Sequence, residues 1–329
     1  MNANRFLSLF IGVILGIFSP ALTTVAGAAG GSSEGFDERG EWSDPTLSQT
    51  TLPQPTDVSG GAAGVFRSSA AADEISPGWG VYEDWSSPFI RSDRWIVVTG
   101  RAHEARREVL DRHLLMRYRL EGSTLSNTGL TAADQYIRAA NPSAIRMIDA
   151  DFQVQRYTVV GCEENPLGTR VRPVQISLPG FNDGTSPGSG DMTGDHFMRI
   201  MVNREAFTVD PPRMLTVSAF LFRCINATCS NAISSIFNLD MGKVMVGAPF
   251  SLRVIREGRE EHHRFRVGFN NNPDVILEYD PNLNQGPMVV PFADIRMQSV
   301  DANCIAGPTV TDSEIKVREI RMNASAVIP

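Results

Sequence analysis

The chain has 329 residues, of which 42% are hydrophobic and 20% are charged, and its formal net charge is −7 at pH 7. This acidity argues against nucleic-acid binding, because neutralising phosphates takes clustered lysines and arginines. The length leaves room for one large β domain after a leader and a linker are set aside.

The first 28 residues have the composition of a secretory signal peptide. A single arginine precedes the apolar run Phe6–Phe18, which only Ser8 interrupts, and the small residues Ala26 to Ala28 form a cleavage site. The run is short for a bilayer span, and a membrane anchor is the alternative. No cysteine stands at the cleavage site to carry a lipid. We therefore expect a mature protein without a membrane span, secreted to the extracellular space or the periplasm.

Residues 29–78 are rich in Gly, Ser, Thr and Pro and show no sustained hydrophobic period. Such a segment buries too little apolar surface to offset the entropy of ordering it, so we expect a flexible linker. The alternative is an amino-terminal arm docked through Trp42 or Phe66. The folded domain is expected to span residues 79–329.

Four cysteines in an exported chain suggest two disulfides. Cys224 and Cys229 are near enough in sequence to close a small loop, which leaves Cys162 to pair with Cys304. The second bridge would enclose about 140 residues and stabilise the fold by about 4–5 kcal/mol if the loop-entropy model holds. Metal binding by the thiols is the alternative, but the chain lacks Cys-x2-Cys pairs.

Several stretches have the hydrophobic pattern of β-strands. Met214–Cys229 carries apolar residues on both alternation phases, which predicts an interior strand that pairs by hairpin with Phe197–Val202. His263–Phe269 alternates apolar with polar residues and turns back into Val275–Tyr279. Arg106–Leu120 fits a helix by its charge spacing, although its second half alternates as a strand, which we favour. Further strands are expected over residues 145–160, 170–178, 250–256 and 315–322. Strands at short spacing with no strong helix predict a sandwich or a barrel.

Large aromatic side chains gather where the domain begins. Trp85, Phe89 and Trp95 lie around a proline turn. Aromatics at the start of a domain usually seal its edge, so we expect core anchors rather than platforms for sugar rings.

The order of these elements resembles the concanavalin A-like lectin and glucanase fold, also called the laminin-G-like jelly roll. It is similar in particular to secreted bacterial proteins that carry such a domain, and the resemblance spans about Val81–Asn323. It implies an all-β, two-sheet antiparallel jelly-roll sandwich. Lectins, polysaccharide hydrolases, lyases and adhesive modules share this fold class, so the resemblance decides no activity. The stretches that carry it are Glu83–Trp95, Gly190–Phe197, Met214–Cys229, Phe250–Ile255, His263–Val267 and Lys316–Met322.

A polar stripe runs along the predicted strand over residues 145–160. Asp149, Asp151, Gln153 and Gln155 share one alternation phase and therefore one face. A glycoside hydrolase needs two carboxylates across the scissile bond, and glucanases of the resembled fold carry them as Glu-x-Asp-x-x-Glu, a pattern that the chain lacks. Asp149 and Asp151 are thus the candidates for catalysis and the four residues together for binding. The alternative is an ordinary solvated face.

Lyases of the resembled fold use a Tyr or His base with an Arg and a Gln near the uronate carboxylate. These residue types occur in the chain, but no local stretch of sequence holds them together. The adjacent His262 and His263 would project to opposite faces of a strand, which argues against a shared metal ion.

A Gly-rich loop offers a candidate calcium site. Asp183, Asp191 and Asp195 fall in or beside this loop, and Asn182 or a backbone carbonyl would complete the oxygen ligands that Ca²⁺ prefers. The spacing matches no EF-hand, and aspartates in such loops often serve turn geometry. A structural calcium ion and ordinary turn chemistry are the two interpretations, and no other cofactor is expected.

Three functions fit these observations. The first is a secreted, non-catalytic sandwich that binds glycan or another component of a cell surface or matrix. The absence of the glucanase acid pattern and the expected long tether favour it, since a tether extends the reach of a binding head. The second is a polysaccharide hydrolase or lyase with an unrecognised acid arrangement. The third is a structural protein that associates with copies of itself.

Overall fold

The computed structural model describes residues 67–68, 79–100, 102–186, 190–230, 232–257, 264–278 and 286–323. The expected leader, almost all of the expected linker and the histidine pair at positions 262 and 263 lie outside these ranges. In this part of the chain, no helix has the length and the apolar character needed to cross a membrane.

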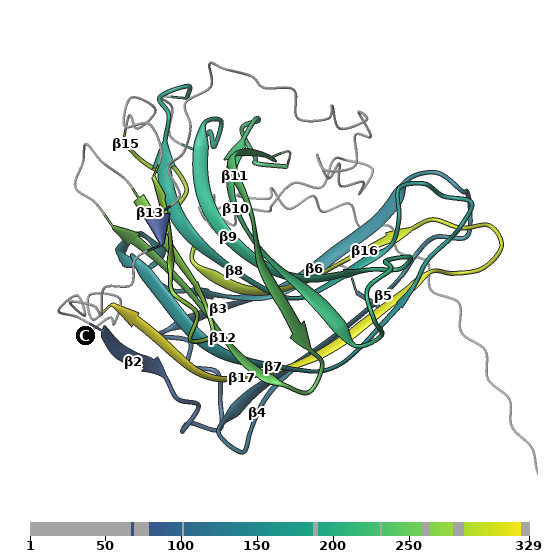
Figure 1. Ribbon diagram of the computed structural model, residues 1–329, viewed down its shortest axis with the longest axis horizontal. Coiled ribbons are helices and arrows are strands. Elements are labelled where there is room, and N and C mark those ends of the chain that lie inside the picture. The colour runs from purple at the N-terminus through teal and green to yellow at the C-terminus, as the bar shows by residue number, and fades with distance from the viewer. Residues whose placement is uncertain are drawn as a thin grey trace, which may run out of the picture. The chain divides into compact units, whose positions relative to one another are not determined.

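The described chain forms two antiparallel sheets (Figure 1), which confirms the predicted two-sheet sandwich. In sheet A the neighbours run β1-β14-β13-β12-β7-β17-β5-β4, and β2 also pairs with β17. The strands of sheet A are β1 Arg67–Ser68, β2 Trp79–Glu83, β4 Glu104–Leu110, β5 His113–Glu121, β7 Met147–Val160, β12 Pro249–Glu257, β13 Arg264–Phe269, β14 Val275–Glu278 and β17 Val310–Asn323.

In sheet B the neighbours run β11-β10-β9-β8-β16-β6-β3, and the short β15 also pairs with β8. The 3-10 turn η2 (Pro142–Ala144) precedes β7. The strands of sheet B are β3 Trp95–Thr99, β6 Leu130–Ala139, β8 Arg170–Asn182, β9 Asp195–Glu205, β10 Met214–Cys224, β11 Ala232–Met245, β15 Gly286–Pro287 and β16 Asp294–Ala302.

Strand β10 is interior, as its sequence predicts, because it pairs with β9 on one side and β11 on the other. Its alternate residues Leu215, Val217, Ala219 and Leu221 are each 0% exposed and belong to the main core. Apolar residues from β7, β12 and β17 of sheet A belong to the same core cluster. The sandwich is therefore held by one apolar layer between the two sheets.

The range 106–120 is a hairpin and not a helix. Strands β4 and β5 pair from Glu104↔Arg119 to Leu110↔His113. The two residues between them, Asp111 and Arg112, have φ angles of 50° and 57°, as a tight hairpin turn requires. No strand was expected from sequence at the positions of β6, β11 and β16, nor at those of the shorter β1, β2, β3 and β15.

The aromatic residues at the start of the domain divide into two groups. Trp85 and Trp95 are buried and stack with ring centroids 6.2 Å apart, and the Trp95 indole N–H donates to Glu83 Oε2 at 3.2 Å. Phe89 is 75% exposed, so its expected role as a core anchor is wrong. It follows a proline in an irregular segment whose backbone does not turn it inward.

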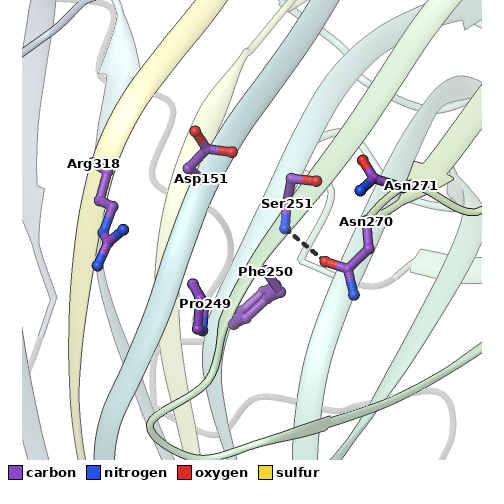
Figure 2. Close-up of a pocket in the computed structure, with 7 residues that line it drawn as sticks. All are labelled: Asp151, Pro249, Phe250, Ser251, Asn270, Asn271 and Arg318. Carbon is purple, nitrogen blue, oxygen red and sulfur yellow. Dashed lines mark hydrogen bonds between the residues drawn. The ribbon is translucent and has the colours of Figure 1, made fainter.

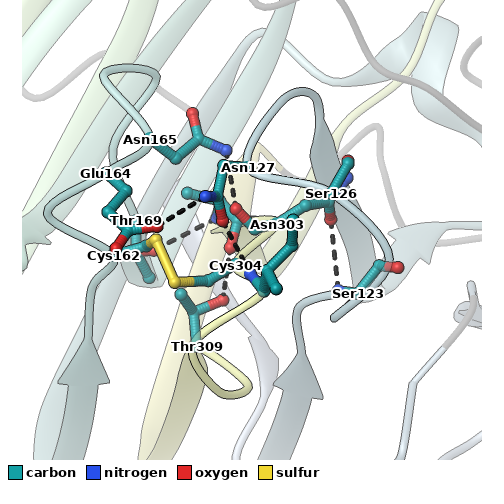
Figure 3. Close-up of a disulfide and its surroundings, with 12 residues drawn as sticks. Ser123, Ser126, Asn127, Cys162, Glu164, Asn165, Thr169, Asn303, Cys304 and Thr309 are labelled. Carbon is teal, nitrogen blue, oxygen red and sulfur yellow. Dashed lines mark hydrogen bonds between the residues drawn. A yellow bond between two sulfur atoms is a disulfide. The ribbon is translucent and has the colours of Figure 1, made fainter.

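The structure contains both predicted disulfides. Cys162 and Cys304 join two loops at one end of the sandwich (Figure 3). Asn165 ties the same loops by donating to the Asn303 carbonyl at 2.9 Å, and it holds the loop before β6 by donating to the Gly129 carbonyl at 3.0 Å. The Cys224–Cys229 bridge closes the short loop after β10.

Candidate functional site

The face of sheet B that points away from sheet A carries a group of largely buried polar side chains. Alternation places these side chains opposite the core residues of each strand. In Figure 1, β8, β9 and β10 lie side by side in this sheet. We call the group the sheet B face; it consists of Asp134, Tyr136 and Arg138 from β6, Arg172, Gln175 and Ser177 from β8, Arg199 from β9, Phe220 from β10, and Asp294, Arg296 and Gln298 from β16.

The strand registers arrange this face in rows that run across the sheet. Arg138 pairs with Asp294, Asp294 with Ser177, Ser177 with Arg199, and Arg199 with Phe220. Each row thus takes one residue from each of five strands. Directly opposed residues in antiparallel strands have Cβ atoms about 4.5–5.5 Å apart, so their side chains contact one another.

A second row begins with Tyr136 and Arg296, which are opposite each other, and continues to Gln175. The Arg296 guanidinium lies 4.4 Å from the centroid of the Tyr136 ring and is 0% exposed. Its two terminal nitrogens pair with Asp134 at 3.0 Å and Asp294 at 2.9 Å. A buried guanidinium is tolerable when it is both paired and hydrogen-bonded, and these contacts fix its orientation.

Arg199 is fixed by a hydroxyl and by aromatic rings. Its Nε–H donates to Ser177 Oγ at 3.1 Å, and its guanidinium lies 4.9 Å from the Phe197 centroid and 5.6 Å from the Phe222 centroid. Phe197 and Phe222 stack at 5.4 Å, and Phe220 stacks on Phe222 at 5.5 Å. The arginine therefore lies beside an aromatic surface made by β9 and β10, in a cation–π arrangement.

Amide groups link the arginines along β8 and β16. Arg172 donates to Gln298 Oε1, which also accepts from Gln175 Nε2 at 3.3 Å. All three residues are buried, and Gln175 Oε1 has no hydrogen-bond partner within the described structure. An unsatisfied buried amide oxygen is costly, so this atom is a position where a ligand hydroxyl would be stabilising.

The candidate calcium residues are separated into different hydrogen-bond networks. Asp183 pairs with Arg223 at 2.6 Å, Asp191 accepts from the Thr193 N–H at 2.8 Å, and the buried Asp195 accepts from Asn182 at 2.8 Å and from the Val289 N–H. No group of three His, Cys, Asp or Glu side chains suited to a metal ion occurs in the described residues. These contacts favour turn geometry and loop anchoring for the three aspartates.

Burial shifts the pKa values of two residues beside this loop, Asp195 and His196. Burial raises the pKa of Asp195, although hydrogen bonds from Asn182 and the backbone oppose the shift. Burial also lowers the pKa of His196, whose ring stacks on Phe181 at 4.5 Å. His196 is therefore held in its neutral form and packs as an aromatic side chain.

The predicted polar stripe lies on β7 in sheet A, on a different sheet from the sheet B face. Asp149 and Asp151 do share a face, because Arg321 Nη2 approaches both, at 3.2 Å and 3.4 Å. Burial raises the pKa of Asp149, while Arg321 and Arg253 oppose the shift. Gln153 donates to the Gly247 carbonyl. A role for this stripe, including Gln155, in binding or catalysis stays a prediction.

An open depression of about 450 Å³ lies beside Asp151. Figure 2 shows Asp151 and Arg318 on neighbouring strands, with Phe250, Ser251 and Asn270 beyond them. The Ser251 N–H donates to Asn270 Oδ1 at 3.0 Å. Asp151 of this lining pairs with Arg321, which lies outside it.

The sandwich is similar to solved glucanase, lyase and lectin structures. An endo-1,3-β-glucanase from Streptomyces sioyaensis matches with 9% identity over 77% of this chain and 100% of its own, at a TM-score of 0.34. The alginate lyase from Klebsiella pneumoniae matches with 11% identity over 66% of this chain and 83% of its own, at a TM-score of 0.33. Lectin I-B4 from Griffonia simplicifolia matches with 12% identity over 74% of this chain and 98% of its own, at a TM-score of 0.31.

These likenesses concern the fold and transfer no residue role. No protein-family model matches the chain, and no curated protein matches it. The chemistry of the site therefore rests on the residues of this chain alone.

The sheet B face is not visible in the sequence, because its residues come from strands far apart in the chain. A signal was nevertheless present in Asp294–Gln298, where polar Asp294, Arg296 and Gln298 alternate with apolar Ile295 and Met297. This alternation would have identified β16, whereas Gln135 breaks the corresponding pattern in β6. Which strands lie beside them could not be read from either run.

Proposed function

We propose that this protein is a secreted glycan-binding protein whose binding site is the sheet B face, and that its glycan carries carboxylate or sulfate groups. The observation that carries the proposal is the convergence of arginine, amide and aromatic side chains from five neighbouring strands on one sheet face. A strictly structural face would not need this combination of groups, because each buried charge costs desolvation energy.

Each residue type on the face suits one part of an acidic sugar. Guanidinium groups bind carboxylate and sulfate oxygens through paired N–H donors. Glutamine amides such as those of Gln175 and Gln298 both donate to and accept from hydroxyls. Aromatic rings such as Phe220 and Phe222 offer flat apolar surface to the C–H face of a sugar ring. The contacts that already fix Arg199 and Arg296 reduce the entropy lost on binding.

The charge of the face favours an anionic ligand. Among its described residues are four arginines and two aspartates, whereas the whole chain has a formal net charge of −7. A locally positive surface on an acidic protein attracts polyanions selectively, and this attraction weakens as salt is added. The acidity of the rest of the chain would also disfavour nonspecific contact with the same polymers.

The signal-peptide pattern of residues 1–28 and the two disulfides support the extracytoplasmic part of the proposal. A binding role is favoured over hydrolysis, because both carboxylates of the face, Asp134 and Asp294, pair with Arg296. Their contacts hold the guanidinium in place.

One observation favours a second function, an elimination lyase. Two guanidinium groups lie near the Tyr136 ring: that of Arg138 is 5.1 Å and that of Arg296 is 4.4 Å from the ring centroid. Gln175 is opposite Arg296 in the same row. These are the residue types that the resemblance implies for lyases, brought together by the fold although they are scattered in the sequence. Degradation of an acidic polymer would produce unsaturated sugar ends that absorb ultraviolet light.

The test is binding of the purified mature chain to immobilised neutral and acidic polysaccharides at low and high salt, with calcium and with chelator. We expect retention on acidic polymers, loss at high salt, and a tenfold or greater weakening in Arg199→Gln, about 1.4 kcal/mol. Arg318→Gln, an exposed arginine of sheet A, is the matched control. Equal binding to neutral polymers, or equal weakening in both variants, would contradict the proposal. Ultraviolet-absorbing products would favour the lyase function. Loss of binding with chelator would indicate that binding requires calcium.

A further inference from the structure

The sheet B face is buried although it lies on the outside of the sandwich. Arg296 and Gln175 are 0% exposed, and Arg199 is 4% exposed. Within the described ranges the strands form two layers, and this face points away from the other layer. Arginine and glutamine on an outer sheet face are ordinarily solvated. The contacts among these side chains account for part of this low exposure, and a segment docked on the face would account for the rest.

The sequence just before the described chain has a charge opposite to that of the face. Residues 29–66 contain six acidic side chains and one basic side chain, Arg39. Phe36 and Trp42 are interspersed among the acids. The acidic residues are Glu34, Asp37, Glu38, Glu41, Asp44 and Asp57.

The length of this segment permits it to reach the face. It joins the described chain at β1, which pairs with β14 at the edge of sheet A. The two sheets of a sandwich lie about 10 Å apart, and a chain of some 25 residues spans up to about 80 Å when extended. Residues 34–44 therefore have ample chain to pass around the edge of the sandwich.

We propose that the acidic segment Glu34–Asp44 docks on the sheet B face of its own chain and occupies the site that an acidic glycan would take. Its carboxylates lie against the guanidinium groups of Arg138, Arg172 and Arg199, and Phe36 and Trp42 extend the aromatic surface of β9 and β10. An acidic glycan binds only when it displaces the segment, so the segment lowers the apparent affinity by the fraction of chains in which the face is occupied.

Photo-crosslinking of the mature full-length chain tests this directly, with p-benzoylphenylalanine in place of Trp42. We expect a crosslinked product of monomer mass whose partner peptides come from β6, β8, β9, β10 or β16. The yield should fall several-fold at about 1 M salt, where the Debye length is about 3 Å. It should fall equally in a variant with Glu34→Gln, Asp37→Asn, Glu38→Gln, Glu41→Gln and Asp44→Asn. Thr46→Ala, Thr50→Ala and Thr51→Ala together form the matched control and should leave the yield unchanged.

Crosslinks to sheet A, crosslinks only between two chains, or no crosslink would overturn the proposal. The second of these results would identify another copy as the occupant. The docking and the glycan proposals fail separately, because crosslinking requires no glycan. Where both hold, the five-site variant binds polygalacturonate several-fold more tightly than the wild type, and the threonine variant binds it equally well.

Discussion

The polar stripe of β7 and the sheet B face are both lines of polar side chains, but they run in different directions. The stripe runs along one strand, so Asp149 to Gln155 can be read from alternation in the sequence. The rows of sheet B run across strands, and Arg138, Asp294 and Ser177 become neighbours only through register. Sequence patterns therefore reveal a polar stripe along a strand far more readily than a site built across a sheet.

The two regions also differ in solvation. The side chains of Asp151 and Arg321 on sheet A are 37% and 29% exposed, whereas those of Asp294 and Arg296 on sheet B are both 0% exposed. Water therefore screens the Asp–Arg pair on sheet A, whereas the Asp–Arg pair on sheet B is desolvated. Equivalent substitutions in the two regions should therefore have very different consequences.

The largest difference is expected from removing one arginine in each region. Arg296→Met leaves two aspartates without their shared partner, and we expect a loss of about 3–5 kcal/mol in the free energy of unfolding. Arg321→Met should cost about 1 kcal/mol or less. Urea denaturation of both variants measures the difference. Equal losses would show that the sheet B pair is no more desolvated than the sheet A pair.

Truncation of an aromatic residue compares the packing of the two regions. Phe220→Ala removes a ring that stacks on Phe222 and is only 9% exposed, so we expect a loss of about 3 kcal/mol. Val160→Ala, at the 47% exposed end of β7, should cost about 0.5 kcal/mol or less. Thermal melting reports both. A loss below about 1 kcal/mol for Phe220→Ala would mean that the aromatic cluster is loosely packed.

The buried carboxyl of Asp301 on β16 should make stability depend on pH more strongly than Asp149 on β7 does. Burial raises the pKa of Asp301 to about 8 from an ordinary value of 3.8, against hydrogen bonds from Thr311. Between those values the folded state binds the proton more tightly than the unfolded state does, so the free energy of unfolding falls as pH rises. Asp301→Asn should remove this fall and stabilise the protein at pH 8 by about 1–3 kcal/mol.

Melting curves between pH 5 and pH 8 test this expectation. The wild type should lose stability with rising pH through Asp301, while Asp301→Asn should lose less. Asp149→Asn is the control on β7, where Arg321 and Arg253 oppose the effect of burial. Parallel curves for the wild type and Asp301→Asn would place the pKa of Asp301 near its ordinary value.

The smallest effect is expected at Asp151. Its carboxylate is 37% exposed and reaches Arg321 at 3.4 Å. Asp151→Asn should change the free energy of unfolding by no more than about 0.5 kcal/mol, because an exposed pair contributes little. A larger loss in urea denaturation would show that the stripe is part of a buried network.

The sequence predicts the elements that alternate locally and misses those that depend on partners. The interior position of β10 and the pairing of both disulfides follow from patterns within short stretches or from counting cysteines. The aspartates at 183, 191 and 195 are near in sequence, yet each finds a different partner, such as Arg223 for Asp183. The sheet B face could not be predicted, because its register depends on the pairing of β16 with both β6 and β8.

The most direct measurement is the affinity of the mature chain for an acidic oligosaccharide, compared between one variant of each region. Isothermal titration with a galacturonate oligomer, at a temperature where melting curves show both proteins to be folded, should show Arg199→Gln to be weakened tenfold or more, about 1.4 kcal/mol. Asp151→Asn should bind as the wild type does. Weakening in Asp151→Asn with unchanged binding in Arg199→Gln would place the site on sheet A and contradict the account.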